Sequence, residues 1–243
     1  NLPRPSPKIL WEKGKGAWHV DAPLLAAGGK IFVATSHLEK EKFGDRALVC
    51  LKAADGAELW KAPLNLNAWG GATLAGDRLI VTGSSIRYDP KELTGAKGEV
   101  VCFKPDGGVE WRKQADRAYL SSAAVAGDLA LVCDTAGEVH ALELKTGRAR
   151  WTTKTGAPYF AGVAVGGDAV YAADLDGKVH ALALSDGRLR WTVDLAADPA
   201  VKAPGMVYGG PMLLGGRLYV ATANVEGKSA GAETVIVCIG EGK

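Results

Sequence analysis

The chain has 243 residues and a formal net charge of +2; 47% of its residues are hydrophobic and 23% are charged. This balance excludes intrinsic disorder and leaves no strongly basic surface of the kind that binds nucleic acid. No apolar stretch approaches the roughly 20 residues that a membrane-spanning helix needs.

The first residues precede the regular part of the chain. Residues 1–7 hold three prolines, and we expect them to form a tail or linker at the start of a single domain that spans 1–243. The segment 8–11 then ends in Trp11. Its composition predicts an outer β-strand that lacks the rest of its sheet.

A 40-residue repeat organises the middle of the chain. Residues 137–151 and 177–191 match without a gap, from Gly-x-Val-His-Ala-Leu to Gly-Arg-x-Arg-Trp. Related segments end at Trp60 and Trp111, and in all four copies a glycine precedes the tryptophan by four residues. Short β-prone runs bounded by Gly-Asp or Asp-Gly turns lie upstream, so each copy predicts four short antiparallel strands. This period is typical of β-propeller blades.

The two ends of the chain complement each other. The segment 234–239 predicts a third strand without its outer strand, whereas residues 8–11 predict an outer strand alone. Pairing of the two would leave no open sheet edge. We therefore predict an all-β fold, a five-bladed β-propeller of four-stranded antiparallel blades, closed by pairing of the N- and C-terminal strands. The tryptophans expected on the outer strands are Trp11, Trp60, Trp111, Trp151 and Trp191.

The repeat resembles that of a known family. Residues 139–142 (Val-His-Ala-Leu) and 146–151 (Thr-Gly-Arg-Ala-Arg-Trp) resemble the quinoprotein-dehydrogenase-like (PQQ-like) β-propellers and their tryptophan-docking motif, although the aspartate of that motif is often missing here. The resemblance is nearest to noncatalytic members, of the kind of the outer-membrane assembly lipoprotein. It implies a periplasmic or otherwise extracytoplasmic location, and it transfers no catalytic residue.

The cysteines do not form a pattern that carries chemistry. Cys50, Cys102, Cys133 and Cys238 fall in different predicted strands and blades. Separation between blades argues against disulfides, and no cluster has the spacing of a zinc site. We expect small buried thiols.

Histidines and acidic turns allow two interpretations. His140 and His180 occupy equivalent repeat positions, which indicates blade packing. Asp174 and Asp176 precede Gly177 and bring two carboxylates close together. No twelve-residue calcium loop surrounds them, and Asp-Gly is also what a tight hairpin requires, so the turn is the favoured interpretation and no metal site is predicted.

The predicted innermost strands are the most informative part for function. Each carries an aromatic residue: Trp18, Trp69, Tyr119, Phe160 and Tyr208. These side chains either fill the channel as a core layer or rim a binding pocket. His19 and Asp21 share one strand face and would supply polar contacts, although a satisfied structural pair is the favoured interpretation over a catalytic one.

Three connections exceed hairpin length, at residues 35–46, 84–98 and 196–205, and the second carries Arg87 and Tyr88. Long loops on a rigid scaffold are common binding sites, and solvent-exposed loops with no binding role are the open alternative.

Two functions of different classes follow. We predict a noncatalytic binding or scaffold propeller that docks a protein partner as part of an extracytoplasmic assembly, with no cofactor. The candidate contact residues are the five aromatic residues, His19, Asp21, Arg87 and Tyr88. The alternative is a quinone-cofactor (PQQ) dehydrogenase, or a cofactor-binding remnant of one, in which Trp69 would stack on the cofactor. The family's enzymes commonly use a vicinal Cys-Cys disulfide, which this sequence lacks.

Overall fold

The computed structural model describes residues 8–86, 90–93, 95–203, 205–224 and 230–240. These residues form 20 strands in five antiparallel sheets, together with one short 3₁₀ helix, η1 (Pro90–Leu93). The all-β prediction is confirmed. Within the same residues, no helix has the length and apolar character needed to cross a membrane.

Each sheet is built from consecutive segments of the chain. The first blade contains β1 (Leu25–Ala27), β2 (Lys30–Thr35), β3 (Ala47–Lys52) and β4 (Glu58–Pro63). The second contains β5 (Asn67–Ala68), β6 (Thr73–Ala75), β7 (Arg78–Ser84), β8 (Gly98–Phe103) and β9 (Val109–Ala115). The third contains β10 (Ala124–Ala126), β11 (Leu129–Cys133), β12 (Glu138–Glu143) and β13 (Ala149–Lys154).

The fourth blade contains β14 (Ala164–Gly166), β15 (Ala169–Ala173), β16 (Lys178–Ala183) and β17 (Leu189–Asp194). The fifth sheet contains β18 (Met212–Leu214), β19 (Arg217–Ala221) and β20 (Ile236–Ile239). In every sheet the chain therefore runs from an innermost to an outermost strand, as in a propeller blade.

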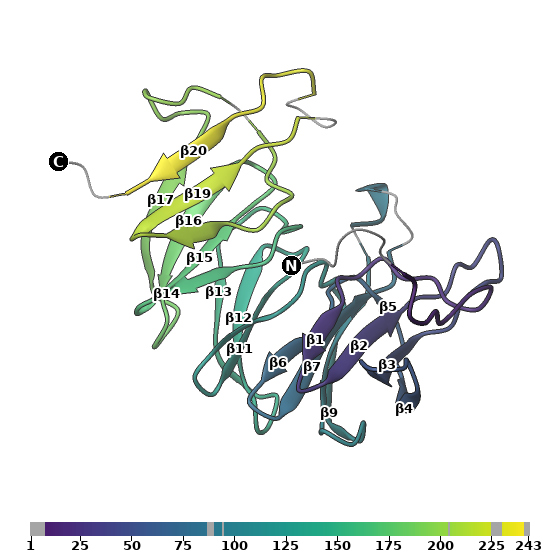
Figure 1. Ribbon diagram of the computed structural model, residues 1–243. Helices are drawn as coiled ribbons and strands as arrows, with labels where there is room; N and C mark the ends of the chain where they lie inside the picture. The colour runs from purple at the N-terminus through teal and green to yellow at the C-terminus, as the bar shows by residue number, and fades with distance from the viewer. Residues whose placement is uncertain (1–7, 87–89, 94, 204, 225–229, 241–243) are drawn as a thin grey trace.

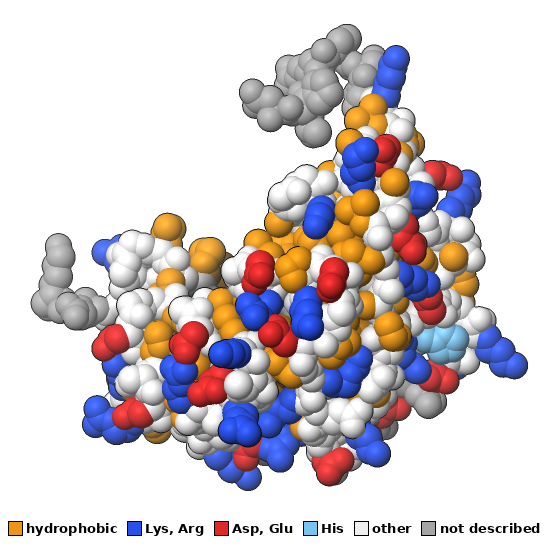
Figure 2. Space-filling view, turned by 90° about the horizontal axis from the view of Figure 1, so that it is seen from below, with side chains coloured by type: hydrophobic (Ala, Val, Ile, Leu, Met, Phe, Trp, Pro, Cys, Tyr) orange, Lys and Arg blue, Asp and Glu red, His pale blue; other side chains and the backbone are white. Residues whose placement is uncertain are grey.

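The five sheets follow one another around an arc, each packed face to face against the next (Figure 1). The innermost strands β1, β6, β10, β14 and β18 contact one another in that order. Seen from below, hydrophobic side chains gather in the inner curve of the arc (Figure 2). The buried core consists of layers between neighbouring sheets, because each sheet has two apolar faces to cover.

The predicted closure of the ring is not observed. Within the described residues β20 pairs only with β19, and residues 8–13 have no strand partner. Trp11 instead rests on the first blade, where its indole N–H donates to the carbonyl of Ala53 at 3.0 Å. The first blade and the fifth sheet lie at the two ends of the arc (Figure 1), so the curvature of the arc keeps the two segments apart.

Tryptophans on outer strands connect the first four sheets in series. The indole N–H groups of Trp60, Trp111 and Trp151 donate to carbonyls of the following blade, those of Pro105, Leu144 and Leu184, at 2.8–3.0 Å. Each ring lies on the glycine of the following blade's last hairpin. Gly187, for example, has φ of 73°, and a Cβ there would lie 2.5 Å from the ring of Trp151. Only glycine satisfies both requirements.

Strand pairing within each of the four sheets places the tryptophan opposite the same kind of residue. Trp60 and Trp111 stand opposite Cys50 and Cys102, and the two later tryptophans stand opposite alanines. A register shift directly beyond this pair recurs in all four blades. Such a β-bulge bends the outer strand. The small partner leaves space for the indole, which explains why only cysteine or alanine occurs opposite these four tryptophans.

We expect Trp151→Ala to lower the free energy of unfolding by about 3–5 kcal/mol, because it empties a buried position between two blades. Trp191→Ala is the matched control, since Trp191 has the same place in its blade but is 36% exposed, against 8% for Trp151. Trp191→Ala should lower the free energy of unfolding by clearly less than Trp151→Ala. Chemical denaturation of both variants checks this. Equal losses would show that the two docking positions do not differ.

Candidate functional site

Three aromatic side chains, from the segments that enter the second, fourth and fifth blades, meet one another. Trp69 and Phe160 lie edge to face with ring centroids 5.9 Å apart, and Phe160 and Tyr208 have centroids 5.1 Å apart. All three are half-buried. Beneath them lie the buried side chains of Leu120 and Ile86. We call Trp69, Phe160 and Tyr208 the aromatic cluster.

The aromatic cluster is positioned by the strand that enters each blade. Asn67 pairs with Ser84 at the edge of β7, and Trp69 follows two residues later. Gly70 comes next, and a Cβ there would lie 2.2 Å from Oγ1 of Thr82, so the backbone passes close to the strand. This close approach fixes the direction in which Trp69 leaves the sheet.

The first blade departs from the predicted alignment. The bridge between His19 and Ser36 makes His19 the equivalent of Asn67, so Asp21 rather than Trp18 stands at the position of Trp69. Trp18 packs with Trp11 over the outward face of the first blade. The predicted His–Asp pair does form, with His19 Nε2 and Asp21 Oδ2 2.5 Å apart.

The third blade departs in a similar way. Leu120 stands where the second, fourth and fifth blades carry an aromatic residue, and Tyr119 is only 1% exposed. The Tyr119 ring lies between blades, 6.1 Å from that of His140. Burial raises the pKa of Tyr119. Tyr119 is therefore placed in the core, not on the surface beside the aromatic cluster.

Two of the predicted long loops lie next to this region. The loop after β2 is held by Asn67, whose Oδ1 accepts hydrogen bonds from the backbone of His37 and from Nε of Arg46, both at 2.9 Å. The loop after β7 packs Ile86 and Leu93 beneath Trp69. It carries η1 at the upper end of Figure 1, on the same side as the β19–β20 connection. Arg87 and Tyr88 lie outside the described residues.

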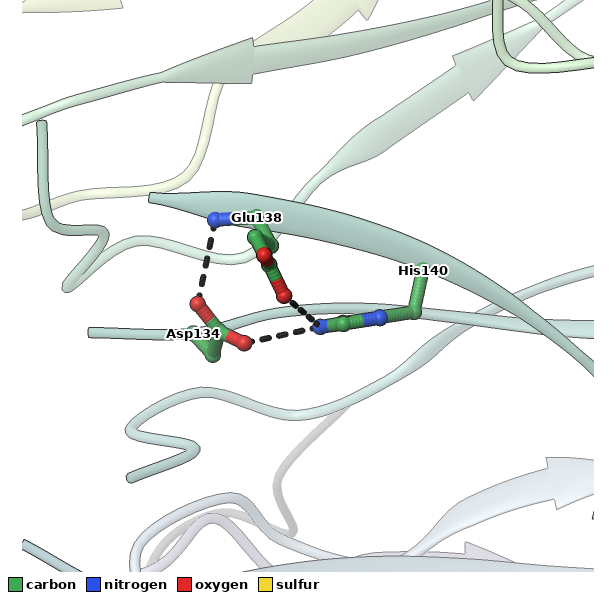
Figure 3. A group of neighbouring side chains, drawn as sticks. All are labelled: Asp134, Glu138 and His140. Atoms are coloured by element: carbon green, nitrogen blue, oxygen red, sulfur yellow. Dashed lines mark hydrogen bonds and ion pairs between the residues drawn. The ribbon is translucent and has the colours of Figure 1, made fainter. Parts of the chain in front are cut away.

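A cluster of polar side chains in the third blade was not predicted as a site. Asp134, Glu138 and His140 have ligand-type atoms within 4.8 Å of one another (Figure 3). Asp134 is fully buried, and its Oδ2 lies 2.7 Å from Nε2 of His140. Its Oδ1 accepts the backbone N–H of Glu138 at 3.0 Å. Such a donor set raises the question of a metal ion.

The surroundings argue for a structural role instead. Arg117 forms ion pairs with Glu138 and with Asp134, the latter at 3.6 Å, and so places a cation beside both carboxylates. The fourth blade repeats the arrangement without the glutamate. There Asp174 holds His180 at 3.1 Å and accepts the backbone N–H of Lys178 at 2.9 Å. In both blades a buried aspartate (Asp134 or Asp174) binds the histidine and a backbone N–H of its hairpin, and we call this arrangement the hairpin lock. It agrees with the turn interpretation of Asp174.

The thiols lie in surroundings that suppress their reactivity. Burial raises the pKa of Cys102 and of Cys133 to about 12, and it also raises that of Cys50. The Cys133 thiol donates to the carbonyl of Ala161 at 2.9 Å. At neutral pH these groups stay protonated, and the thiolate is the reactive form. The buried thiols predicted from sequence are confirmed for these three, whereas Cys238 is exposed.

We expect a thiol reagent at pH 8 to modify Cys238 rapidly in the folded protein and the other three cysteines only after unfolding. Burial and the raised pKa of Cys50, Cys102 and Cys133 keep them as inaccessible thiols. Mass spectrometry of labelled peptides, with and without denaturant, assigns each site. Rapid labelling of Cys102 in the folded state would contradict the buried placement.

We expect Asp134→Ala and Asp174→Ala each to lower the free energy of unfolding by about 2–4 kcal/mol, because each leaves buried donors without an acceptor. A chelator should leave the melting temperature of the wild-type chain unchanged. A drop in melting temperature on chelation that disappears in Asp134→Ala would identify a metal ion in the third blade.

Comparison with known proteins agrees with the repeat pattern. The family described as outer membrane protein assembly factor BamB matches residues 3–159 and 136–236. BamB from Moraxella catarrhalis is similar in structure, with a TM-score of 0.62 and 18% identity over 83% of this chain and 55% of that one. A europium-containing methanol dehydrogenase has a TM-score of 0.64 and 14% identity over 90% and 56%. The computationally designed Ika8 protein has a TM-score of 0.61 and 10% identity, over 88% of this chain and 57% of that one.

At these identities the likeness to solved structures shows the fold alone, and the chain spans little more than half the length of each. No curated protein matches the chain. The family match extends over nearly all of the sequence and includes the four tryptophan repeats. The chain therefore belongs to the BamB family of PQQ-like β-propeller proteins.

Proposed function

We propose that this chain is a noncatalytic scaffold that binds a protein partner through the aromatic cluster, as part of an extracytoplasmic assembly. The observation that carries the proposal is the meeting of Trp69, Phe160 and Tyr208, from three different blades, beside the loop that carries η1. Half-buried aromatic side chains on a rigid base are typical anchors of protein interfaces.

The rigidity of the base supports this role. The rings rest on buried Leu120 and Ile86, and the hydrogen bonds of Asn67 tie the loop after β2 to the second blade. A partner would therefore meet side chains that are already ordered, which reduces the entropic cost of binding. Membership of the BamB family supports an interaction role and an extracytoplasmic location.

The alternative, a quinone-cofactor dehydrogenase, finds less support in the residues. Cys50, Cys102 and Cys133 are separately buried free thiols, so they offer no vicinal disulfide against which a cofactor could stack. The cluster of Asp134, Glu138 and His140 already has Arg117 as its counter-charge. Trp69 already makes an edge-to-face contact with Phe160. These residues do not fit the cofactor, and no catalytic step is assigned.

The test compares three immobilised proteins exposed to an extracytoplasmic extract of the source cells. They are the wild-type chain, a Phe160→Ala/Tyr208→Ala variant, and a control variant, Val109→Ala/Leu189→Ala, which truncates exposed apolar residues on outer strands. We expect a partner retained by wild type and control but bound at least about tenfold more weakly by the aromatic variant.

Binding of the purified partner must reproduce that order of affinities. Melting temperatures establish that all three proteins are folded. Equal binding by the three folded proteins would exclude the aromatic cluster as the interface. Saturable binding of the quinone cofactor with reduction of a dye by an alcohol would exclude the noncatalytic role.

A further inference from the structure

The hairpin lock of the third blade is bonded to the segment that enters the fourth blade. The backbone carbonyl of Asp134 accepts the N–H of Tyr159 at 3.0 Å, and Tyr159 directly precedes Phe160 of the aromatic cluster. The carbonyl of Gly137, in the same hairpin, accepts the N–H of Thr155 at 2.9 Å. The lock therefore holds the approach to Phe160 at two points.

The hairpin lock of the fourth blade makes equivalent contacts with the segment that enters the fifth. The backbone carbonyl of Asp174 accepts the N–H of Val207 at 3.3 Å, and Val207 directly precedes Tyr208. A Cβ on Gly177, in this hairpin, would lie 2.3 Å from the carbonyl oxygen of Gly205, so the two backbones pass in close contact. Each lock thus ends one residue before a different ring of the aromatic cluster.

The aspartate side chain sets the direction of its own backbone carbonyl. Oδ1 of Asp134 accepts the N–H groups of Ala136 and Glu138 at 2.9 and 3.0 Å, while Oδ2 binds Nε2 of His140 (Figure 3). Because these bonds close the turn around a fully buried carboxylate, they leave the peptide after Asp134 little freedom to rotate. Without the carboxylate, the turn and the carbonyl that faces the next blade can reorient together.

The two locks have the same parts, so they can be compared directly. In the fourth blade Oδ1 of Asp174 accepts the N–H groups of Asp176 and Lys178 at 3.0 and 2.9 Å, and Oδ2 lies 3.1 Å from Nε2 of His180. Both lock aspartates are fully buried. Substitution of either one removes the same kinds of bond, but the ring that loses its support differs.

We propose that Asp134 and Asp174 are positioning residues of the partner-binding surface, Asp134 for Phe160 and Asp174 for Tyr208. The inference rests on the proposed function, because it assigns these aspartates a role in that same surface. Since both are fully buried, neither carboxylate reaches the partner. Each acts through its hairpin and one hydrogen bond between blades, and so keeps one ring ordered in the place where the partner meets it.

Amide hydrogen exchange in the isolated chain tests the positioning without any partner. The quantity compared is the ratio of the exchange rate of the Tyr159 amide to that of the Val207 amide, because a loss of global stability accelerates both and cancels in their ratio. We expect the ratio to rise at least about tenfold in Asp134→Ala and to fall at least about tenfold in Asp174→Ala, relative to wild type.

Control variants separate positioning from stability. Trp111→Ala removes the indole contact with the carbonyl of Leu144, at the end of β12 opposite the lock, and should leave the ratio within about twofold of wild type. Asp134→Asn keeps an oxygen that accepts the hairpin N–H groups and should also keep the wild-type ratio. If the alanine variants fail to fold, Asp134→Ser and Asp174→Ser should shift the ratio in the same two opposite directions. An unchanged ratio in folded variants would overturn the inference.

Retention of a partner from the extracytoplasmic extract is measured separately. Asp134→Ala and Asp174→Ala should each bind the retained protein at least about threefold more weakly than wild type, and Asp134→Asn should bind it as wild type does. Full retention by both alanine variants, where Phe160→Ala/Tyr208→Ala loses the partner, would overturn the inference. A shifted exchange ratio with full retention by every variant, the aromatic one included, would instead overturn the proposed function and leave the positioning intact.

Discussion

The contact between an outer-strand indole and the glycine of the next blade is the constraint on which the structure depends. Each sheet has two apolar faces, and neither can be covered from within a sheet of three or four short strands. The indole of Trp60, Trp111 or Trp151 crosses to the following blade, buries its ring there and satisfies its N–H on a backbone carbonyl. Stability is therefore close to a sum of neighbour terms, as in other repeat architectures.

Because these contacts are made by the outer strands, the loops beside the aromatic cluster are available for other roles. The hairpin locks of Asp134 and Asp174 hold the third and fourth blades with buried carboxylates, each matched to a histidine and to backbone N–H groups. The aromatic cluster sits above buried aliphatic side chains and contributes to no sheet. The residues that hold the blades together are therefore separate from those that form the aromatic cluster.

The fold could be predicted from sequence because the repeat carries it. The match between 137–151 and 177–191, at an offset of 40 residues, and the fixed spacing of glycine before tryptophan report contacts that are local in the chain. The inner strands were harder, since isolated bridges such as that of His19 with Ser36 set their register and leave no periodic signal. Trp18 and Tyr119 were misplaced for this reason. Their aromatic character indicated burial, but not which surface would bury them.

Two features depend on geometry that the sequence does not carry. The curvature of the arc follows from the angle between packed sheets. The sequence therefore predicts the strand character of the two terminal segments, but it does not predict that they lie apart. The neutralisation of Glu138 and Asp134 by Arg117 joins residues from a connection and a hairpin, 21 and 17 positions apart. In the fourth blade a lysine replaces the glutamate, and only the three-dimensional comparison shows that the lock persists.

Because Trp60, Trp111 and Trp151 each dock on the blade that follows in the same way, the gain or loss of one such unit introduces no new type of contact. An inserted blade would receive the tryptophan of its predecessor and offer its own to its successor. Gene duplication could therefore change the number of units in this architecture without redesigning a core. The identical spacing in the third and fourth blades, gap-free over fifteen positions, is what a recent event of that kind would leave behind.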